Sequence, residues 1–391
     1  MAAAADLLAN CGEFAGAVAA AASHHRSFLD GRYQPEDLAT WSRESRAWLL
    51  NLLHCPPGGG ALAPEVVGRE DHGDYVRERV LLSMAPWSRV SCDLLLPKQP
   101  RGGRWPAPAV VALHCHGGVF RWGREKVVEA ADPVTEHPSL RDYRARLYGG
   151  RGYANELARR GYVVACIDAF YFGERRLRWP HGRWPEPYRA EEATLTPDSE
   201  PWLRLLDRAH QEVQPRVAGA LLQAGTTWPG VMVWDDRQTI DYLQTRSEVD
   251  PERIGAVGLS VGGYRCAYLA ATDERVRAAV VVGWMCGLAD LWPVGRWPHT
   301  MGWVHHVPGL FQECDLPDVA SLACPRALFV MQGSQDRLFP LAGMERAIAR
   351  IAAVYDKAGV ADRFTGRIYD APHRFDLEMQ EEAFVWLDGW L

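Results

Sequence analysis

The sequence feature that most constrains this chain is a G-x-S-x-G pattern made by Gly258, Ser260 and Gly262. Residues 254–259 form a short apolar run that predicts a buried strand, and residues 261–272 have the apolar spacing of a helix. A strand that turns directly into a helix strains the residue at the turn and projects its side chain outward. Flanking glycines let the two backbones pass without a Cβ in the way. The pattern predicts a nucleophilic Ser260; the alternative is a glycine-rich turn with an incidental serine.

The composition narrows the class of protein. A net charge of −6 argues against a nucleic-acid surface, and no apolar run is long enough to cross a bilayer, so neither partner is expected. The alanine-rich start carries Asp6 and Glu13 and is a poor secretion signal. Nine cysteines without a C-x-x-C pair predict a disulfide-free, cytoplasmic protein. Sixteen tryptophans, many of them in expected loops, indicate either an aromatic-walled pocket or packing of insertions on the core.

The order of expected elements predicts an α/β fold. The expected strands are residues 75–84, 89–97, 109–113, 162–167, 254–259, 278–282, 327–331 and 367–369. The expected helices are residues 153–160, 202–224, 237–243, 261–272, 341–357 and 377–391. Antiparallel strands followed by strand–helix alternation indicate a mostly parallel central sheet with helices on both faces. Such sheets carry their sites beyond the carboxyl ends of the strands.

The chain divides into an extension and one large domain. We expect residues 1–70 to form an N-terminal helical extension, with a helix opening at Gln34-Pro35-Glu36-Asp37, and residues 71–391 to form the catalytic domain. Two stretches, about residues 170–230 and 284–323, interrupt the alternation of strands and helices. Loops of this length in a compact domain are usually functional, so both are expected to form pocket walls or a lid.

A nucleophilic serine needs a base, and the base needs an orienting acid. Asp336 directly follows the expected strand 327–331, which we expect beside the Ser260 strand, and His373 follows the last strand. The order Ser260, Asp336, His373 is the one that this architecture uses. Asp290 and Asp315 are rival acids because both follow the preceding strand, and a solvated loop side chain is the alternative for His373.

The third requirement is a pair of backbone donors for the oxyanion. The amide of Val261 is one, and the glycine-rich stretch Gly117-Gly118 after the strand 109–113 offers the other. His114 and His116 could also be interpreted as a metal pair, but no third ligand follows at matching spacing. We expect neither a metal nor an organic cofactor.

Five stretches together resemble the α/β-hydrolases, in the esterase branch that includes acetyl xylan esterases and dienelactone-hydrolase-like proteins. They are H-C-H-G-G, G-Y-V-V-A-C-I-D-A-F-Y-F-G-E-R, V-D-P-E-R-I-G-A-V-G-L-S-V-G-G, A-C-P-R-A-L-F-V-M-Q-G-S-Q-D and D-A-P-H-R-F, spread over residues 75–391. The resemblance implies an α/β-hydrolase fold and a serine hydrolase of carboxylic esters with Ser260, Asp336 and His373 as its triad. Dienelactone hydrolases use cysteine as the nucleophile, whereas position 260 is serine.

Residues that follow the strand ends are candidates for the substrate pocket. By position alone these are Trp122, Tyr171, Arg175, Trp284, Trp303, His305 and His306. Arg175, near Asp168 and Glu174, has two interpretations: a substrate-positioning arginine, or an internal brace for the insertion, which we favour.

These residues predict hydrolysis of a small-molecule ester through an acyl-enzyme. A lactone, an amide or a C–C bond next to a carbonyl would use the same machinery, and a non-catalytic binding protein on this scaffold is a further alternative. An oligopeptidase is disfavoured because the chain has no room for a large gating domain. A homo-oligomer is compatible with the sequence but not indicated by it.

Overall fold

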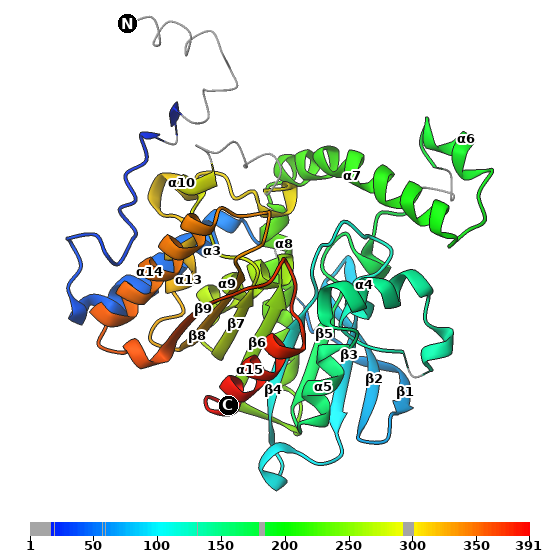
Figure 1. Ribbon diagram of the computed structural model, residues 1–391, viewed down its shortest axis with the longest axis horizontal. Helices are drawn as coiled ribbons and strands as arrows, with labels where there is room; N and C mark the ends of the chain where they lie inside the picture. The colour runs from blue at the N-terminus through cyan, green and yellow to red at the C-terminus, as the bar shows by residue number, and fades with distance from the viewer. Residues whose placement is uncertain are drawn as a thin grey trace, which may run out of the picture.

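The computed structural model describes residues 17–18, 20–56, 58, 60–130, 132–179, 184–291 and 301–391. Most of the alanine-rich start and residues 292–300 of the second expected insertion lie outside these ranges. The described residues form one nine-stranded sheet in the order β1-β2-β3-β5-β4-β6-β7-β8-β9 (Figure 1). β1, β2, β3 and β5 pair antiparallel, and the pairs from β5 through β4 to β9 are all parallel. The mostly parallel α/β fold predicted from the sequence is confirmed.

The strands and helices have the following bounds. The strands are β1 (Glu65–Asp71), β2 (Tyr75–Ala85), β3 (Ser88–Pro97), β4 (Ala107–Leu113), β5 (Val163–Ile167), β6 (Val249–Leu259), β7 (Val276–Val282), β8 (Ala327–Gly333) and β9 (Phe364–Tyr369). The longer helices are α3 (Leu38–Leu53), α4 (Pro138–Tyr148), α5 (Tyr153–Arg159), α7 (Glu200–Gln223), α8 (Trp228–Gln244), α9 (Val261–Thr272), α14 (Leu341–Lys357) and α15 (Leu377–Asp388). Short helices include η5 (Gly173–Arg175), α6 (Tyr188–Glu192), α10 (Leu288–Leu291), η7 (Trp303–His305), α12 (Leu310–Glu313) and α13 (Leu316–Ser321).

The two faces of the sheet are covered by different helices. α3, α8, α9 and α14 pack on one face, and α5 and α15 pack on the other (Figure 1). Every residue of β4 and of β8 is buried, as expected for strands covered on both sides. Because β4 to β9 pair in parallel, their carboxyl ends lie at one edge of the sheet, and α7 lies at this edge (Figure 1).

Three elements differ from the sequence prediction. β1 was not expected, because all of its residues are exposed and it has no apolar periodicity. It begins at Glu65, so the sheet starts before the expected boundary at residue 70. α4 was also missed, and α8 begins at Trp228 inside the first expected insertion rather than at Arg237. No helix in the described part of the chain is both long and apolar enough to span a membrane.

A buried arginine ties the sheet to the first insertion. The Arg124 side chain is fully buried and donates through Nε to Asp93 at 3.0 Å, through Nη1 to Asp168 at 2.6 Å and through Nη2 to Glu174 at 2.9 Å. Asp93 lies on β3, Asp168 follows β5 and Glu174 lies in η5. A single side chain therefore fixes three separate segments next to the site edge of the sheet.

Replacing Arg124 with methionine should lower the free energy of unfolding by about 3–5 kcal/mol, because it leaves buried carboxylates without a counter-charge. Urea denaturation measures the loss. Arg121→Met is the matched control, since the Arg121–Asp198 pair is solvent-exposed and is expected to contribute less than about 1 kcal/mol. Equal losses in the two variants would contradict a bracing role for Arg124.

Candidate active site

Ser260 lies at the turn between β6 and α9 in a conformation that is rare for a residue other than glycine. Its φ is 61° and its ψ is −121°. Its N–H donates to the Val282 carbonyl at 2.8 Å, which joins the turn to the end of β7. A Cβ on Gly258 would lie 2.3 Å from the backbone of Gly262, and a Cβ on Gly262 would lie 2.1 Å from the Leu113 carbonyl oxygen. Both flanking glycines are therefore required by close backbone packing.

His373 and Asp336 are in direct contact. His373 Nδ1 lies 2.6 Å from Asp336 Oδ2, and the other oxygen of Asp336 accepts the Leu338 N–H at 2.8 Å. The His373 ring also lies against Gly283, where an added Cβ would come within 3.1 Å of Cε1. Gly283 follows Val282, the residue that accepts the Ser260 N–H, so the three candidate triad residues lie around the end of β7. Within the described residues the Ser260 hydroxyl makes no hydrogen bond, and such contacts often tighten only when substrate binds.

The two rival acids are engaged elsewhere. Asp290 pairs with Arg346 on α14 at 2.5 Å. Asp315 caps α13 and accepts the Leu288 N–H at 2.7 Å. One detail of the sequence prediction is wrong. Asp336 lies in the loop after β8, and β8 is not beside β6, because β7 lies between them. The loop after β9 bridges that gap by bringing His373 to Asp336.

The two oxyanion candidates on the β4 loop are not equivalent. Gly117 and Gly118 both have positive φ, of 56° and 70°. The Gly118 N–H already donates to Nδ1 of His116 at 2.9 Å, whereas the Gly117 N–H has no acceptor among the described residues. Val261 is the first residue of α9, so its N–H has no acceptor within the helix. The amides available to an oxyanion are therefore those of Gly117 and Val261.

His114 and His116 serve the loop rather than a metal. His114 accepts the Ala169 N–H through Nε2 at 2.9 Å, and its Nδ1 donates to the Cys115 carbonyl at 3.0 Å. Burial lowers the pKa of His116 to about 3 and holds that of His114 well below its usual value. The two rings are neutral and their hydrogen bonds point to different segments. No group of three or more metal-ligating side chains occurs in the part of the chain that the structure describes.

Trp284 and His305 are the substrate-pocket candidates that lie nearest to the candidate triad. Their rings stack at 4.2 Å, and both contact Tyr264, one turn after Ser260 on α9. His305 is 7% exposed, burial lowers its pKa, and neither of its ring nitrogens has a hydrogen-bond partner among the described residues. Buried polar atoms without partners are rare and commonly mark a ligand or water position.

The other candidates lie farther from the site or have structural partners. Trp303 and His306 contact each other at 5.0 Å, and the His306 ring is hydrogen-bonded to the Met301 carbonyl. Tyr171 is buried and donates to the His210 carbonyl. Arg175 donates to Asp235 at 2.6 Å and to the Asp168 carbonyl at 3.2 Å, which is the bracing arrangement favoured from the sequence.

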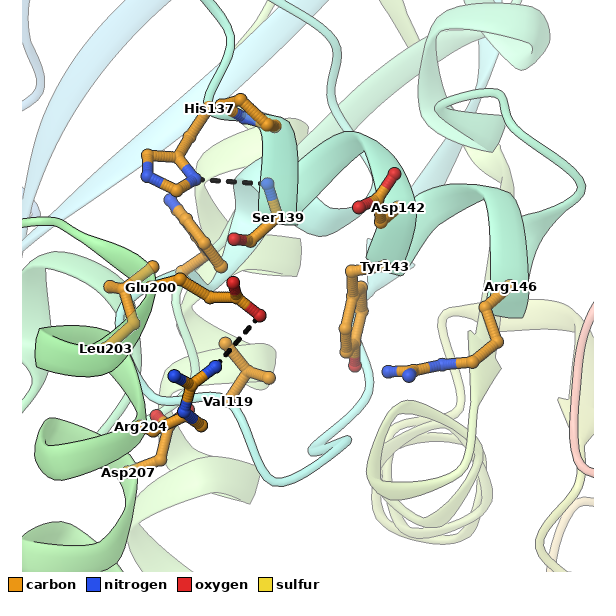
Figure 2. Close-up of a pocket in the computed structure, with 12 residues that line it drawn as sticks. Val119, His137, Ser139, Asp142, Tyr143, Arg146, Glu200, Leu203, Arg204 and Asp207 are labelled. Atoms are coloured by element: carbon orange, nitrogen blue, oxygen red, sulfur yellow. Dashed lines mark hydrogen bonds and ion pairs between the residues drawn. The ribbon is translucent and has the colours of Figure 1, made fainter.

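Trp122 lines a cavity of about 660 Å³ between α4 and α7 (Figure 2). Figure 2 shows Tyr143 and Arg146 on one side of it, facing Glu200 and Arg204 on the other. The remaining lining residues are Val119, His137, Pro138, Ser139, Asp142, Leu203 and Asp207. Val119 belongs to the loop of Gly117 and Gly118, so this loop contributes one residue to the cavity wall. Its volume falls in the range of small-molecule pockets.

Sequence reasoning missed two charged residues that hold this loop. Asp207 on α7 accepts the Phe120 N–H at 2.9 Å. Lys126 is buried and donates to the carbonyls of Cys115, His116 and Val119 at 3.1, 2.8 and 2.7 Å. The only signal in the sequence was the R-E-K run of residues 124–126, which follows a glycine-rich loop.

The charge of Asp207 should make stability depend on pH. Burial raises its pKa from 3.8 to about 6. Between these values the folded protein holds a proton that the unfolded chain releases, so stability from this group falls as pH rises through the window. Asp207→Asn keeps an oxygen for the Phe120 N–H and removes the charge. We expect its melting temperature to exceed that of wild type at about pH 7 and to match it below about pH 4.

Asp198→Asn is the control with the opposite sign. The hydrogen bond from Arg121 holds the pKa of Asp198 below its usual value, so its charge contributes stability above the unfolded pKa that is lost as pH falls. This variant should be less stable than wild type at about pH 7. A destabilised Asp207→Asn variant at neutral pH would contradict the expected sign.

The chain is similar in sequence to one hydrolase family and to one protein named as a hydrolase. Residues 151–285 match the model of the dienelactone hydrolase family, a segment that contains Ser260 but neither Asp336 nor His373. The chain is 27% identical over 350 residues to the protein named "Putative hydrolase YtaP" of Bacillus subtilis (strain 168). That alignment covers 89% of this chain and 99% of the relative.

Solved structures share its fold. A putative acetyl xylan esterase from Bacteroides fragilis superposes with a TM-score of 0.70 at 18% identity, covering 92% of this chain and 82% of that one. A glucuronoyl esterase from Solibacter usitatus superposes with a TM-score of 0.58 at 16% identity, covering 90% and 93% of the two chains. The chain therefore has the α/β-hydrolase fold, and its residues 151–285 match the dienelactone hydrolase family model.

Proposed function

We propose that this hydrolase cleaves a carboxylic ester of a small molecule through a Ser260–His373–Asp336 triad. The observation that carries the proposal is the convergence of these residues on the end of β7. The strained Ser260 turn is bonded to Val282, and the His373–Asp336 pair lies against the next residue, Gly283. A positive φ at a serine is costly and persists where function or packing requires it.

The proposed reaction has two steps. His373 takes the proton of Ser260 as its oxygen attacks the ester carbonyl, and Asp336 holds the imidazole in the tautomer that can accept that proton. The amides of Val261 and Gly117 stabilise the oxyanion. The alcohol leaves with a proton from His373, and the acyl group stays on Ser260. His373 then activates water, which releases the acid and restores the serine.

The surroundings of the triad support a polar substrate larger than the acyl group alone. The cavity next to Val119 offers two aromatic rings, Trp122 and Tyr143, together with charged side chains of both signs. His305, whose ring stacks on Trp284, offers two ring nitrogens without a hydrogen-bond partner among the described residues. We propose that the cavity and His305 receive the two ends of the ester.

Labelling with a fluorophosphonate probe tests the proposal. Wild-type protein should gain the phosphonyl mass on the peptide that contains Ser260, and Ser260→Ala and His373→Ala should remain unmodified. A panel of p-nitrophenyl esters of increasing acyl length, acetylated sugars, lactones and amides then identifies the bond that is cleaved. Modification of Ser260→Ala at the wild-type rate would remove the proposed nucleophile.

The location, cofactors and partners of the protein remain predictions. We propose a cytoplasmic location, which is supported by the eight cysteines in the described residues, all of them free thiols. The proposed reaction uses no metal or organic cofactor, and its partner is a small-molecule ester rather than a nucleic acid or a membrane.

A further inference from the structure

The loop after β4 is organised around one buried cation. Lys126 Nζ donates to the carbonyls of Cys115, His116 and Val119 and lies 4.7 Å from the ring centre of Phe172. The side chain is fully buried, yet no carboxylate contacts the ammonium among the described residues. Its three hydrogen bonds therefore all go to backbone carbonyls, which belong to this loop or to the residue that leads into it.

The carbonyl bonds fix the direction of the free amide. The peptide bond between His116 and Gly117 is planar and trans, so its C=O and N–H point in opposite directions. Because the His116 carbonyl accepts a hydrogen bond from Lys126, the Gly117 N–H points away from the Lys126 ammonium, and Gly117 itself is solvent-exposed. The first turn of α9 lies against the chain that leads into this loop, since a Cβ on Gly262 would touch the Leu113 and His114 carbonyls.

The same geometry repeats one step along the loop. The Val119 carbonyl also accepts from Lys126, and the N–H on the other side of that peptide, from Phe120, donates to Asp207 at 2.9 Å. The loop is thus held by Lys126, which binds its carbonyl oxygens, and by Asp207, which accepts the Phe120 N–H. Hydrogen bonds in a chain polarise one another, so a cation on the His116 carbonyl makes the Gly117 N–H a stronger donor.

We propose that Lys126 is a positioning residue of the oxyanion site, which aims and polarises the Gly117 N–H toward the carbonyl that Ser260 attacks. This inference rests on the proposed ester hydrolysis. A lysine suits the role because its ammonium offers three donors around a point, whereas arginine presents a planar fork. The chain has only three lysines among its 43 basic residues, and one of them occupies this position.

The experiment compares an oxygen ester with its sulfur analogue. p-Nitrophenyl acetate forms an oxyanion, whereas p-nitrophenyl thionoacetate places the weaker acceptor sulfur at the same position. Lys126→Met should lower kcat/KM for the oxygen ester by about ten- to hundredfold, part of the effect of losing an oxyanion donor outright. The thionoester rate should fall less, so the ratio of the two rates falls. Lys126→Gln, which keeps N–H donors, should restore part of that ratio.

Lys357→Met is the matched control. Lys357, the last residue of α14, also donates to two backbone carbonyls, those of Phe28 and Tyr33 on the N-terminal extension, and lies 4.8 Å from the Phe28 ring. Its replacement should lower the melting temperature and leave the oxygen-to-sulfur ratio unchanged. Rates are normalised to the fraction of each protein that a fluorophosphonate titrates at Ser260.

The outcomes separate the two proposals. If wild type is not modified at Ser260, the proposed function is overturned and this inference with it. If wild type is modified and both Lys126 variants keep the wild-type oxygen-to-sulfur ratio, only the role of Lys126 is overturned. A lower ratio in Lys126→Met with partial recovery in Lys126→Gln supports both.

Discussion

Replacing Ser260 with alanine should lower kcat for an activated ester by about 10⁴- to 10⁶-fold, the range seen when a triad nucleophile is removed. The variant keeps His373, Asp336 and the oxyanion amides, but it has no atom that can form the acyl intermediate. Its fold should persist, because the Ser260 hydroxyl makes no hydrogen bond within the described residues. Steady-state hydrolysis of p-nitrophenyl acetate, with melting temperatures measured in parallel, checks both expectations.

Ser247→Ala is the control for this variant. Ser247 is exposed just before the amino end of β6, and among the described residues its hydroxyl is hydrogen-bonded only to Glu248. Its loss should leave kcat unchanged. Turnover of Ser260→Ala at a rate close to that of wild type would mean that another side chain attacks the ester.

Replacing Asp336 with asparagine should lower kcat/KM by about 10⁴-fold while the shape of the site is retained. The carboxylate of Asp336 accepts a hydrogen bond from Nδ1 of His373 at 2.6 Å. An asparagine amide can donate to Nδ1 instead, which moves the ring proton to Nε2 and leaves no acceptor for the Ser260 proton. The same ester assay measures the loss.

Two further aspartates make this test discriminating. Asp315→Asn keeps an oxygen for the α13 cap, and Asp290→Asn removes only an ion pair with Arg346. Both should retain kcat/KM. If Asp315→Asn or Asp290→Asn lost activity and Asp336→Asn kept it, the triad acid would have to be assigned to the segment after β7 instead.

The local sequence pattern was sufficient to predict those features that depend on residues close together in the chain. The turn at Ser260 could be predicted from the glycines two residues away on either side. Asp336 and His373 could be predicted from their positions just after the ends of strands. The structure puts His373 in contact with Asp336, as expected from the order of these elements. Their catalytic roles stay predictions until the variants are measured.

Long-range packing decided what the sequence did not reveal. Lys126 looks like a surface residue in its R-E-K context, and only the fold of residues 115–119 around its ammonium buries it. The distinction between Gly117 and Gly118 depends on one ring nitrogen of His116. β1 has no buried residue, so it could not be predicted from a pattern of apolar residues. The position of β7 between β6 and β8 is likewise a property of the assembled sheet.

The helix that follows Ser260 has a consequence for how such a protein can diversify. All twelve residues of α9 are buried, so this segment has no solvent-facing side along which it could open locally. The residues that we propose to face the substrate come instead from α4, α7 and the segment after β7. Mutations in these segments can change substrate recognition one residue at a time without moving the Ser260 hydroxyl. The architecture separates the proposed reaction centre, on a fully buried helix, from more exposed segments that tolerate substitution more readily.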